Sequence, residues 1–105
     1  MDTHPLVWLQ QCLGADLEAA GLRPTEQRYD PDCFGSGFAL YADTRTQLRM
    51  VWDGKERAAR LEQRAVGATE WTCVAVMLTE GGLEGAVIDH AKVDPWRAAI
   101  RKLWR

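Results

Sequence analysis

Cys33 and Ser36 are the candidate nucleophiles of this chain. Nucleophilic catalysis needs a base beside the nucleophile and a third group that orients the base. His90 is the candidate base, and its ring could be oriented by one of Asp30, Asp32 and Asp89. Many unrelated sequences contain residues of these types, so the set is weak evidence for catalysis. The sequence Gly-Ser-Gly around Ser36 also lacks the G-x-S-x-G spacing of a nucleophile elbow. The sequence therefore predicts no enzyme.

Metal and cofactor binding are not indicated by the residue spacing. The two histidines, His4 and His90, do not stand at ligand spacing from cysteine or carboxylate partners. The glycine-rich run Gly81–Gly85 has neither a phosphate-binding pattern nor a P-loop lysine after it. We therefore expect no metal and no cofactor, and a structural turn at these glycines.

Asp30 and Asp32 form a pair of carboxylates on either side of Pro31. Acid–base catalysis would need a shifted pKa, and a polar loop rarely supplies the burial that causes such a shift. Aspartate is common in turns because its side chain accepts local hydrogen bonds from the backbone. We therefore expect a turn here with exposed carboxylates.

The C-terminal segment is basic, with four cationic side chains at Arg97, Arg101, Lys102 and Arg105. Domains that bind nucleic acid are usually basic overall, whereas this chain has a net charge of −2. Cations near the C-terminus of a helix also interact favourably with the helix dipole. The sequence therefore predicts no nucleic-acid partner.

The 105 residues suit one compact domain, residues 1–105, and a hydrophobic content of 47% is typical of a soluble protein. No apolar run approaches the roughly 20 residues that span a bilayer, and the segment Met1–Pro5 lacks the basic start of a signal peptide. The three cysteines show no paired motif. We expect a cytoplasmic protein with reduced thiols and no membrane contact.

Two helices are predicted, at residues 4–20 and 95–104. In the first, Thr3 is the expected cap, Gly21 ends the helix, and four leucines form one apolar stripe: Leu6, Leu9, Leu13 and Leu17. Gly14 inside this helix costs about 1 kcal/mol relative to alanine, which we attribute to close packing against another element. In the second, Asp94 is the expected cap and Pro95 the first helical residue.

The remaining apolar patterns predict strands. Asp53-Gly54 indicates a hairpin with a type I′ turn, and residues 25–29 are an expected short edge strand. Residues 55–66 are predicted to form a strand or a helix, since apolar and polar residues alternate in places but the segment is rich in helix formers.

The expected apolar faces are Phe34, Phe38 and Leu40 in one strand and Leu48, Met50 and Trp52 in the next. Trp52, Trp71 and Trp96 are expected to be buried, with Trp71 in a central strand.

These elements predict an α+β fold, in which a central antiparallel sheet of about four to five strands packs against an N-terminal and a C-terminal helix. The charge is uneven, since residues 1–44 and 65–94 are net acidic and residues 45–64 and 95–105 are net basic. This pattern and the absence of catalytic motifs favour a small cytosolic protein-binding domain. Toxin-neutralising immunity proteins and small acidic secretion chaperones share this general profile. We expect a basic protein partner that is bound by acidic loop residues, namely Asp30, Asp32, Glu80 and Glu84.

The alternative is a small ligand-binding domain or enzyme with a pocket between the helices and the sheet. A pocket that joins Cys33 or Ser36 to His90 would favour this alternative.

Overall fold

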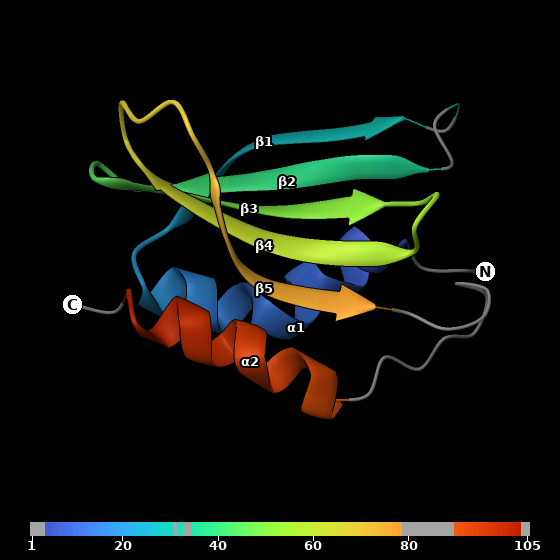
Figure 1. Cartoon of the computed structure of the whole chain (residues 1–105). Helices are drawn as coiled ribbons and strands as arrows, with labels where there is room; N and C mark the ends of the chain where they lie inside the picture. Colours follow the sequence, from blue (N-terminus) through green and yellow to red (C-terminus); the bar gives the residue numbers. More distant parts are fainter. Residues whose placement is uncertain (1–3, 31, 33–34, 79–89, 104–105) are drawn as a thin grey trace.

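A computed structural model describes residues 4–30, 32, 35–78 and 90–103 of the chain. In these residues one antiparallel sheet carries both helices on one of its faces, an α+β arrangement (Figure 1). The five strands pair in the order β1-β2-β3-β4-β5, each with the next along the chain. The helices are α1 (Pro5–Ala19) and α2 (His90–Arg101). The strands are β1 (Arg23–Asp30), β2 (Ser36–Ala42), β3 (Thr46–Asp53), β4 (Ala58–Ala65) and β5 (Thr72–Leu78).

Helix α1 ends as its sequence predicts but is capped by a different residue. The cap is His4, whose Nδ1 accepts a hydrogen bond from the Leu6 amide at 3.1 Å. Thr3, the expected cap, lies outside the described residues. At the other end Gly21 has a φ of 79°, and Leu22 N–H donates to Leu17 C=O across it. This left-handed glycine cap turns the chain toward β1 and buries Leu22.

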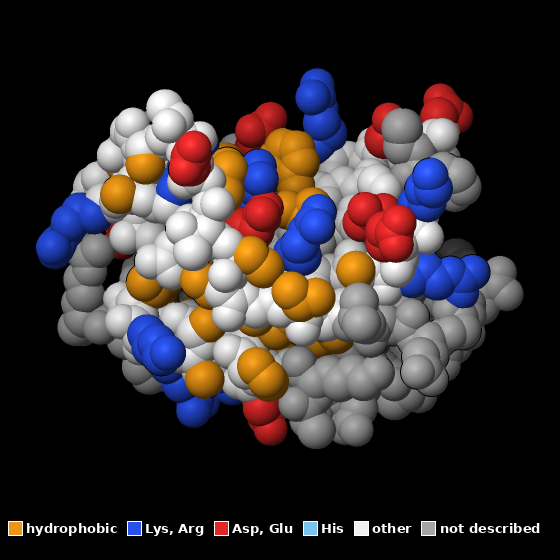
Figure 2. All heavy atoms as spheres, in the orientation of Figure 1, with side chains coloured by type: hydrophobic (Ala, Val, Ile, Leu, Met, Phe, Trp, Pro, Cys, Tyr) orange, Lys and Arg blue, Asp and Glu red, His pale blue; other side chains and the backbone are white. Residues whose placement is uncertain are grey.

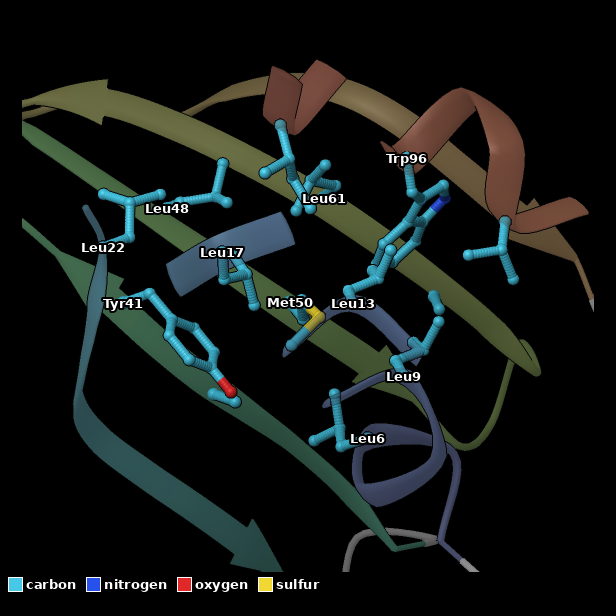
Figure 3. Close-up of a cluster of buried hydrophobic side chains, with 14 of the residues drawn as sticks. Leu6, Leu9, Leu13, Leu17, Leu22, Tyr41, Leu48, Met50, Leu61 and Trp96 are labelled. Atoms are coloured by element: carbon cyan, nitrogen blue, oxygen red, sulfur yellow. The ribbon is translucent and has the colours of Figure 1, made fainter. Parts of the chain in front are cut away.

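The core forms between the leucine stripe of α1 and one face of the sheet. All four stripe leucines are almost completely buried, as predicted. They meet Leu48 and Met50 of β3 and Leu61 of β4, while Trp96 of α2 fills the space beside Leu13 (Figure 3). Trp52 and Trp96 are buried as expected, at 1% and 0% exposure. Burial of this apolar surface, at roughly 25 cal/mol per Å², is the main stabilising term of the fold.

The apolar face predicted for β2 is wrong. Phe38 and Leu40 are only half-buried and lie on the side of the sheet away from the helices, and Phe34 is outside the described residues. The buried side chains of β2 are Ala39 and Tyr41. Ala39 pairs with Met50 in the sheet register, and directly opposite residues share a face. The core-facing residues of β3 therefore determine which side of β2 faces the helices.

The hairpin between β3 and β4 exists, but its predicted type I′ turn is wrong. Asp53 pairs with Ala58, so four residues form the loop. Arg57 adopts the left-handed conformation with a φ of 52°, and Gly54 is not among the described glycines with positive φ. The Asp53 carboxylate accepts hydrogen bonds from two loop amides, those of Lys55 and Glu56. These bonds favour a longer loop, because they satisfy backbone donors that a two-residue turn would not contain.

Residues 58–65 form a strand, which decides between the two interpretations of this segment. Leu61 is completely buried and faces the core, while Glu62 points to the opposite side and binds Arg49 of β3 at 2.7 Å. Burial of one alternating face outweighs the helix propensity of the individual residues, since propensity is a weak term beside tertiary packing.

Helix α2 begins at His90, five residues before the expected start at Pro95. Val93, Trp96 and Ile100 of this helix are completely buried against the core. Pro95 has no amide hydrogen and removes one hydrogen bond of the helix, and the burial of Val93 helps to hold the turn that precedes it. No helix in the described ranges is long and apolar enough to cross a membrane.

The expectation that Trp71 is a core residue of a central strand is wrong. Trp71 precedes β5, which is the edge strand of the sheet, and it is only half-buried. Its ring contacts the guanidinium groups of Arg49 and Arg64, each with its central carbon 4.2 Å from the ring centroid. Both arginines project from the face of the sheet away from the helices. Trp71 therefore anchors the β4–β5 connection through cation–π contacts instead of filling the core.

This placement predicts different costs for two tryptophan substitutions. Trp71→Ala should lower the free energy of unfolding by about 1–2 kcal/mol, because partly exposed cation–π contacts are modest. Trp96→Ala should lower it by about 3–5 kcal/mol, because it leaves a cavity in the core. Urea denaturation of both variants measures the difference. Equal losses would contradict the placement of Trp71 outside the core.

Candidate functional site

The predicted acidic site is described only in part. Asp30 ends β1 and Asp32 follows in the turn, and both are exposed. The Asp30 carboxylate accepts a hydrogen bond from the Asp32 amide at 3.0 Å, so it also holds the turn. Glu80 and Glu84 lie outside the described residues. The structure thus places two predicted partner-binding carboxylates together at one end of an edge strand.

The candidate nucleophile set is not assembled in the described part of the chain. Ser36 Oγ accepts a hydrogen bond from the Gly54 amide at 2.9 Å, which ties β2 to the β3–β4 loop. Cys33, Asp89 and the side chain of His90 lie outside the described residues. Within the described ranges, no three His, Cys, Asp or Glu side chains gather where they could hold a metal ion.

Two basic residues of α2, Arg97 and Arg101, form a structural contact with α1. Asp16 of α1 has a side chain only 10% exposed, and its two carboxylate oxygens face Arg97 Nε at 2.9 Å and Arg101 Nε at 3.3 Å. Arg97 also donates to the backbone carbonyl of Cys12 at 3.3 Å. Asp16 was not singled out by the sequence, because the partners that neutralise it are more than 80 residues away in the chain.

A groove lies between α1 and β1. Helix α1 packs mainly on β2 and β3, and all eight residues of β1 are exposed. Gly37 of β2 lets β1 approach closely, because a side-chain carbon there would stand 2.3 Å from the Arg28 carbonyl oxygen. Gln27 and Tyr29 of β1 pair with Ala39 and Gly37, so both point to the side of the sheet that carries α1. They form one wall of the groove, and α1 forms the other.

One end of the groove is an apolar pocket of about 240 Å³. It is lined by His4, Leu6, Val7, Gln27 and Tyr29. The His4 ring meets the Tyr29 ring edge-on, with centroids 4.8 Å apart. Because Nδ1 of His4 accepts from the backbone, Nε2 carries the hydrogen and donates to the Gly35 carbonyl at 2.7 Å. Both ring nitrogens therefore hold the chain, and the ring serves as a fixed wall.

The other end of the groove is a pocket of about 380 Å³ around Gly14. It is lined by Gly14, Leu17, Glu18, Leu22, Arg23, Pro24 and Tyr41. A side-chain carbon added at Gly14 would meet nothing within 4 Å. The expected close packing of Gly14 is therefore wrong, and the glycine leaves open space on the wall of this pocket. Between the pockets, Gln10 Nε2 donates to Tyr41 Oη at 3.0 Å and contacts Gln27 Oε1 at 3.4 Å.

A row of residues on α1 is the sequence signal that could have indicated this groove. Val7, Gln10, Gly14 and Glu18 recur at helical spacing beside the leucine stripe. A glycine in the middle of such a row is unfavourable for the helix, and it has no packing reason in this structure. The row gains a neighbour only in the fold, where β1 lies opposite to it.

The comparisons with known proteins found no match. No family model matches the chain, and no curated protein and no solved structure is similar to it at a significant level.

The contact between Asp16 and the α2 arginines predicts a specific loss of stability. Asp16→Ala should lower the free energy of unfolding by about 2 kcal/mol, because it removes charge-assisted hydrogen bonds and leaves Arg97 partly buried without its main partner. The control is Asp94→Ala, since Asp94 is 70% exposed and contacts the same Arg97 at 3.5 Å. That loss should stay below about 0.5 kcal/mol. Chemical denaturation compares the two variants, and similar losses would contradict the structural role of Asp16.

The described cysteines differ in their expected reactivity. Burial raises the pKa of the Cys12 thiol, although the charge of Arg97 opposes this effect. The reactive thiolate is therefore scarce at Cys12 at neutral pH, whereas Cys73 is exposed on β5. In a Cys33→Ser background, an aromatic disulfide reagent should label Cys73 quickly and Cys12 slowly, and the Cys12 rate should increase as the pH rises. Equal rates at pH 7 would contradict this assignment.

Proposed function

We propose that this chain is a non-enzymatic protein-binding domain that takes an extended segment of a partner protein along β1. The observation that carries the proposal is an edge strand with all eight residues exposed beside an open groove. The outward backbone groups of an edge strand can pair with an added strand, which provides affinity without sequence specificity. Pockets beside the strand then select alternate side chains of the ligand.

The two pockets define the side chains that the ligand would carry. One pocket lies beside Gln27 and Tyr29, and the other beside Arg23 and Pro24. The midpoints of these two pairs of β1 residues lie four to five residues apart, or roughly 13–15 Å at the rise of an extended strand. Side chains four residues apart in a strand point to the same face. We therefore expect a ligand with two apolar residues at positions i and i+4.

The charges near β1 favour a ligand with a basic residue at one end. Asp30 and Asp32 are exposed at the end of β1 that adjoins the apolar pocket. A lysine or arginine of the ligand would meet these carboxylates beyond the paired strand. This proposal therefore retains the basic partner that is expected from the sequence. The basic residue of the ligand would lie next to Asp30 and Asp32.

The other half of β1 limits where a strand can be added. Pro24 has no amide hydrogen to donate, and the register with β2 shifts between Pro24 and Glu26. Prolines and bulges are features that protect edge strands from uncontrolled pairing. Backbone pairing would therefore involve mainly residues 26–30, with the ligand's second apolar side chain reaching the pocket at Gly14.

Gly14 offers a direct test, because a small side chain there should stabilise the helix and a large one should block ligand binding. Gly14→Ala should raise the free energy of unfolding by about 1 kcal/mol, since no neighbour obstructs the methyl group. Gly14→Leu should fill the pocket and weaken ligand binding at least tenfold. The matched control is Ala15→Leu, an exposed position on the same helix outside both pockets.

The binding measurement needs a defined set of ligands. Random 12-residue peptides displayed on phage would be selected against the full chain and then synthesised for titration. We expect enriched peptides with apolar residues at i and i+4 and a terminal basic residue. Their binding should be lost with Gly14→Leu, weakened by Asp30→Asn/Asp32→Asn and unchanged with Ala15→Leu. Selected peptides that ignore the groove variants would reject this function.

A further inference from the structure

The outer face of the sheet, on the side away from α1 and α2, carries apolar side chains among charged ones. An antiparallel sheet with one uncovered face commonly carries polar residues on that face. Here the apolar side chains that point outward include Phe38, Leu40, Val51 and Val76. Val76 is 56% exposed, and the other three are half-buried between their neighbours. Figure 2 shows apolar and charged side chains interleaved over the strands. The described residues provide no layer that covers them.

One row across the strands combines apolar and basic residues. The register pairs Arg28 with Phe38, Phe38 with Val51, Val51 with Arg60 and Arg60 with Val76. Strands in a sheet are about 4.8 Å apart, so Arg28 and Arg60 are separated by roughly 14 Å with two apolar side chains between them. Neither arginine forms an ion pair within the described part of the chain. The row therefore offers an apolar centre between two available cations.

The other charges of the outer face are largely engaged with one another. Arg49 binds Glu62 at 2.7 Å, and Arg64 donates to Gln47 at 2.6 Å. Both arginines also stack on Trp71. Apart from this cluster, the described part of the face presents Arg28 and Arg60 together with three carboxylates: Glu26 and Asp30, which flank Arg28 along β1, and Asp53, which pairs with Ala58 at the end of β3 and accepts hydrogen bonds from two loop amides. The row through Phe38 and Val51 therefore carries positive charge at both of its ends, with carboxylates in the rows beside it.

We propose that the outer face is a second docking surface and that its occupant is an amphipathic helix of a partner protein with carboxylates on both sides of its apolar stripe. An α-helix with its side chains is about 10–12 Å wide, which fits between two cations roughly 14 Å apart. A helix lying over β2 and β3 would place its stripe on Phe38 and Val51. Its flanking carboxylates would meet Arg28 on one side and Arg60 on the other. This mirrors α1, which packs on the same two strands from the inner side.

The proposal is tested with a designed peptide probe and the full chain. The probe is a fluorescein-labelled helical peptide of about 18 residues with a leucine stripe flanked by glutamates. A second peptide carries lysine at every glutamate position. The acidic probe should bind in a fluorescence anisotropy titration, and its affinity should fall as salt is raised, because the flanking ion pairs are partly exposed. The lysine peptide should bind at least tenfold more weakly.

Charge reversal on the protein locates the site. Arg28→Glu/Arg60→Glu should weaken the acidic probe at least tenfold. The control is Arg45→Glu/Lys55→Glu, which makes the same change in net charge at two exposed turn positions and should alter affinity less than twofold. Far-ultraviolet circular dichroism verifies that both double variants are folded. Amide chemical shifts of the unmodified chain should change at Phe38 and Val51 on addition of the probe.

Four results would overturn the proposal. They are a lack of binding by the acidic probe, equal binding by the lysine peptide, equal losses in the two double variants, and shift changes confined to the groove between α1 and β1. Sedimentation equilibrium of the protein alone tests whether a second copy of the chain occupies this face. A dimer that is abolished by Arg28→Glu/Arg60→Glu would mean that a second copy of the chain, and no partner helix, occupies this face. Since the groove lies on the inner side, this result does not depend on the fate of the peptide-binding proposal.

Discussion

The packing of one leucine stripe against one face of the sheet is the contact on which the rest of the structure depends. Leu6, Leu9, Leu13 and Leu17 can be buried together only if a sheet offers a matching apolar surface, which Leu48 and Met50 of β3 supply. Because β3 is the middle strand, this contact orients its neighbours through the hydrogen-bond register. It also determines which side of every other strand faces the helices.

The second helix is attached by apolar and polar contacts together. Trp96 and Ile100 fill the core beside the leucine stripe, and Arg97 and Arg101 converge on the nearly buried Asp16. A carboxylate with so little access to water requires partners, and these partners come from the opposite end of the chain. Two arginines of the basic C-terminal segment, Arg97 and Arg101, are therefore part of the contact between the helices.

Among the described residues, the same packing leaves two surfaces uncovered. Helix α1 is centred under β2 and β3, so the inner side of β1 remains open and forms a groove with the row of residues that includes Gly14. The outer face receives neither helix and retains an apolar row between Arg28 and Arg60. Both surfaces arise because a small domain with two helices cannot cover every strand of a five-stranded sheet. These surfaces carry the functional proposals for this chain.

Local sequence patterns are enough to predict the class of fold, the extent of α1, its buried stripe and the hairpin between β3 and β4, because periodicity, glycine caps and turn residues act between neighbours in the chain. The sequence also predicted that Asp30 and Asp32 are exposed, although Asp30 is the last residue of β1 and not part of the turn. Long-range contacts determine which face of β2 is buried, why Trp71 stays near the surface and what surrounds Gly14. Each of these depends on neighbours distant in the sequence: Met50 beneath Ala39, Arg49 and Arg64 around Trp71, and β1 across from α1. Alternating patterns mark two faces of a strand equally well, and only the register with the next strand selects one of them.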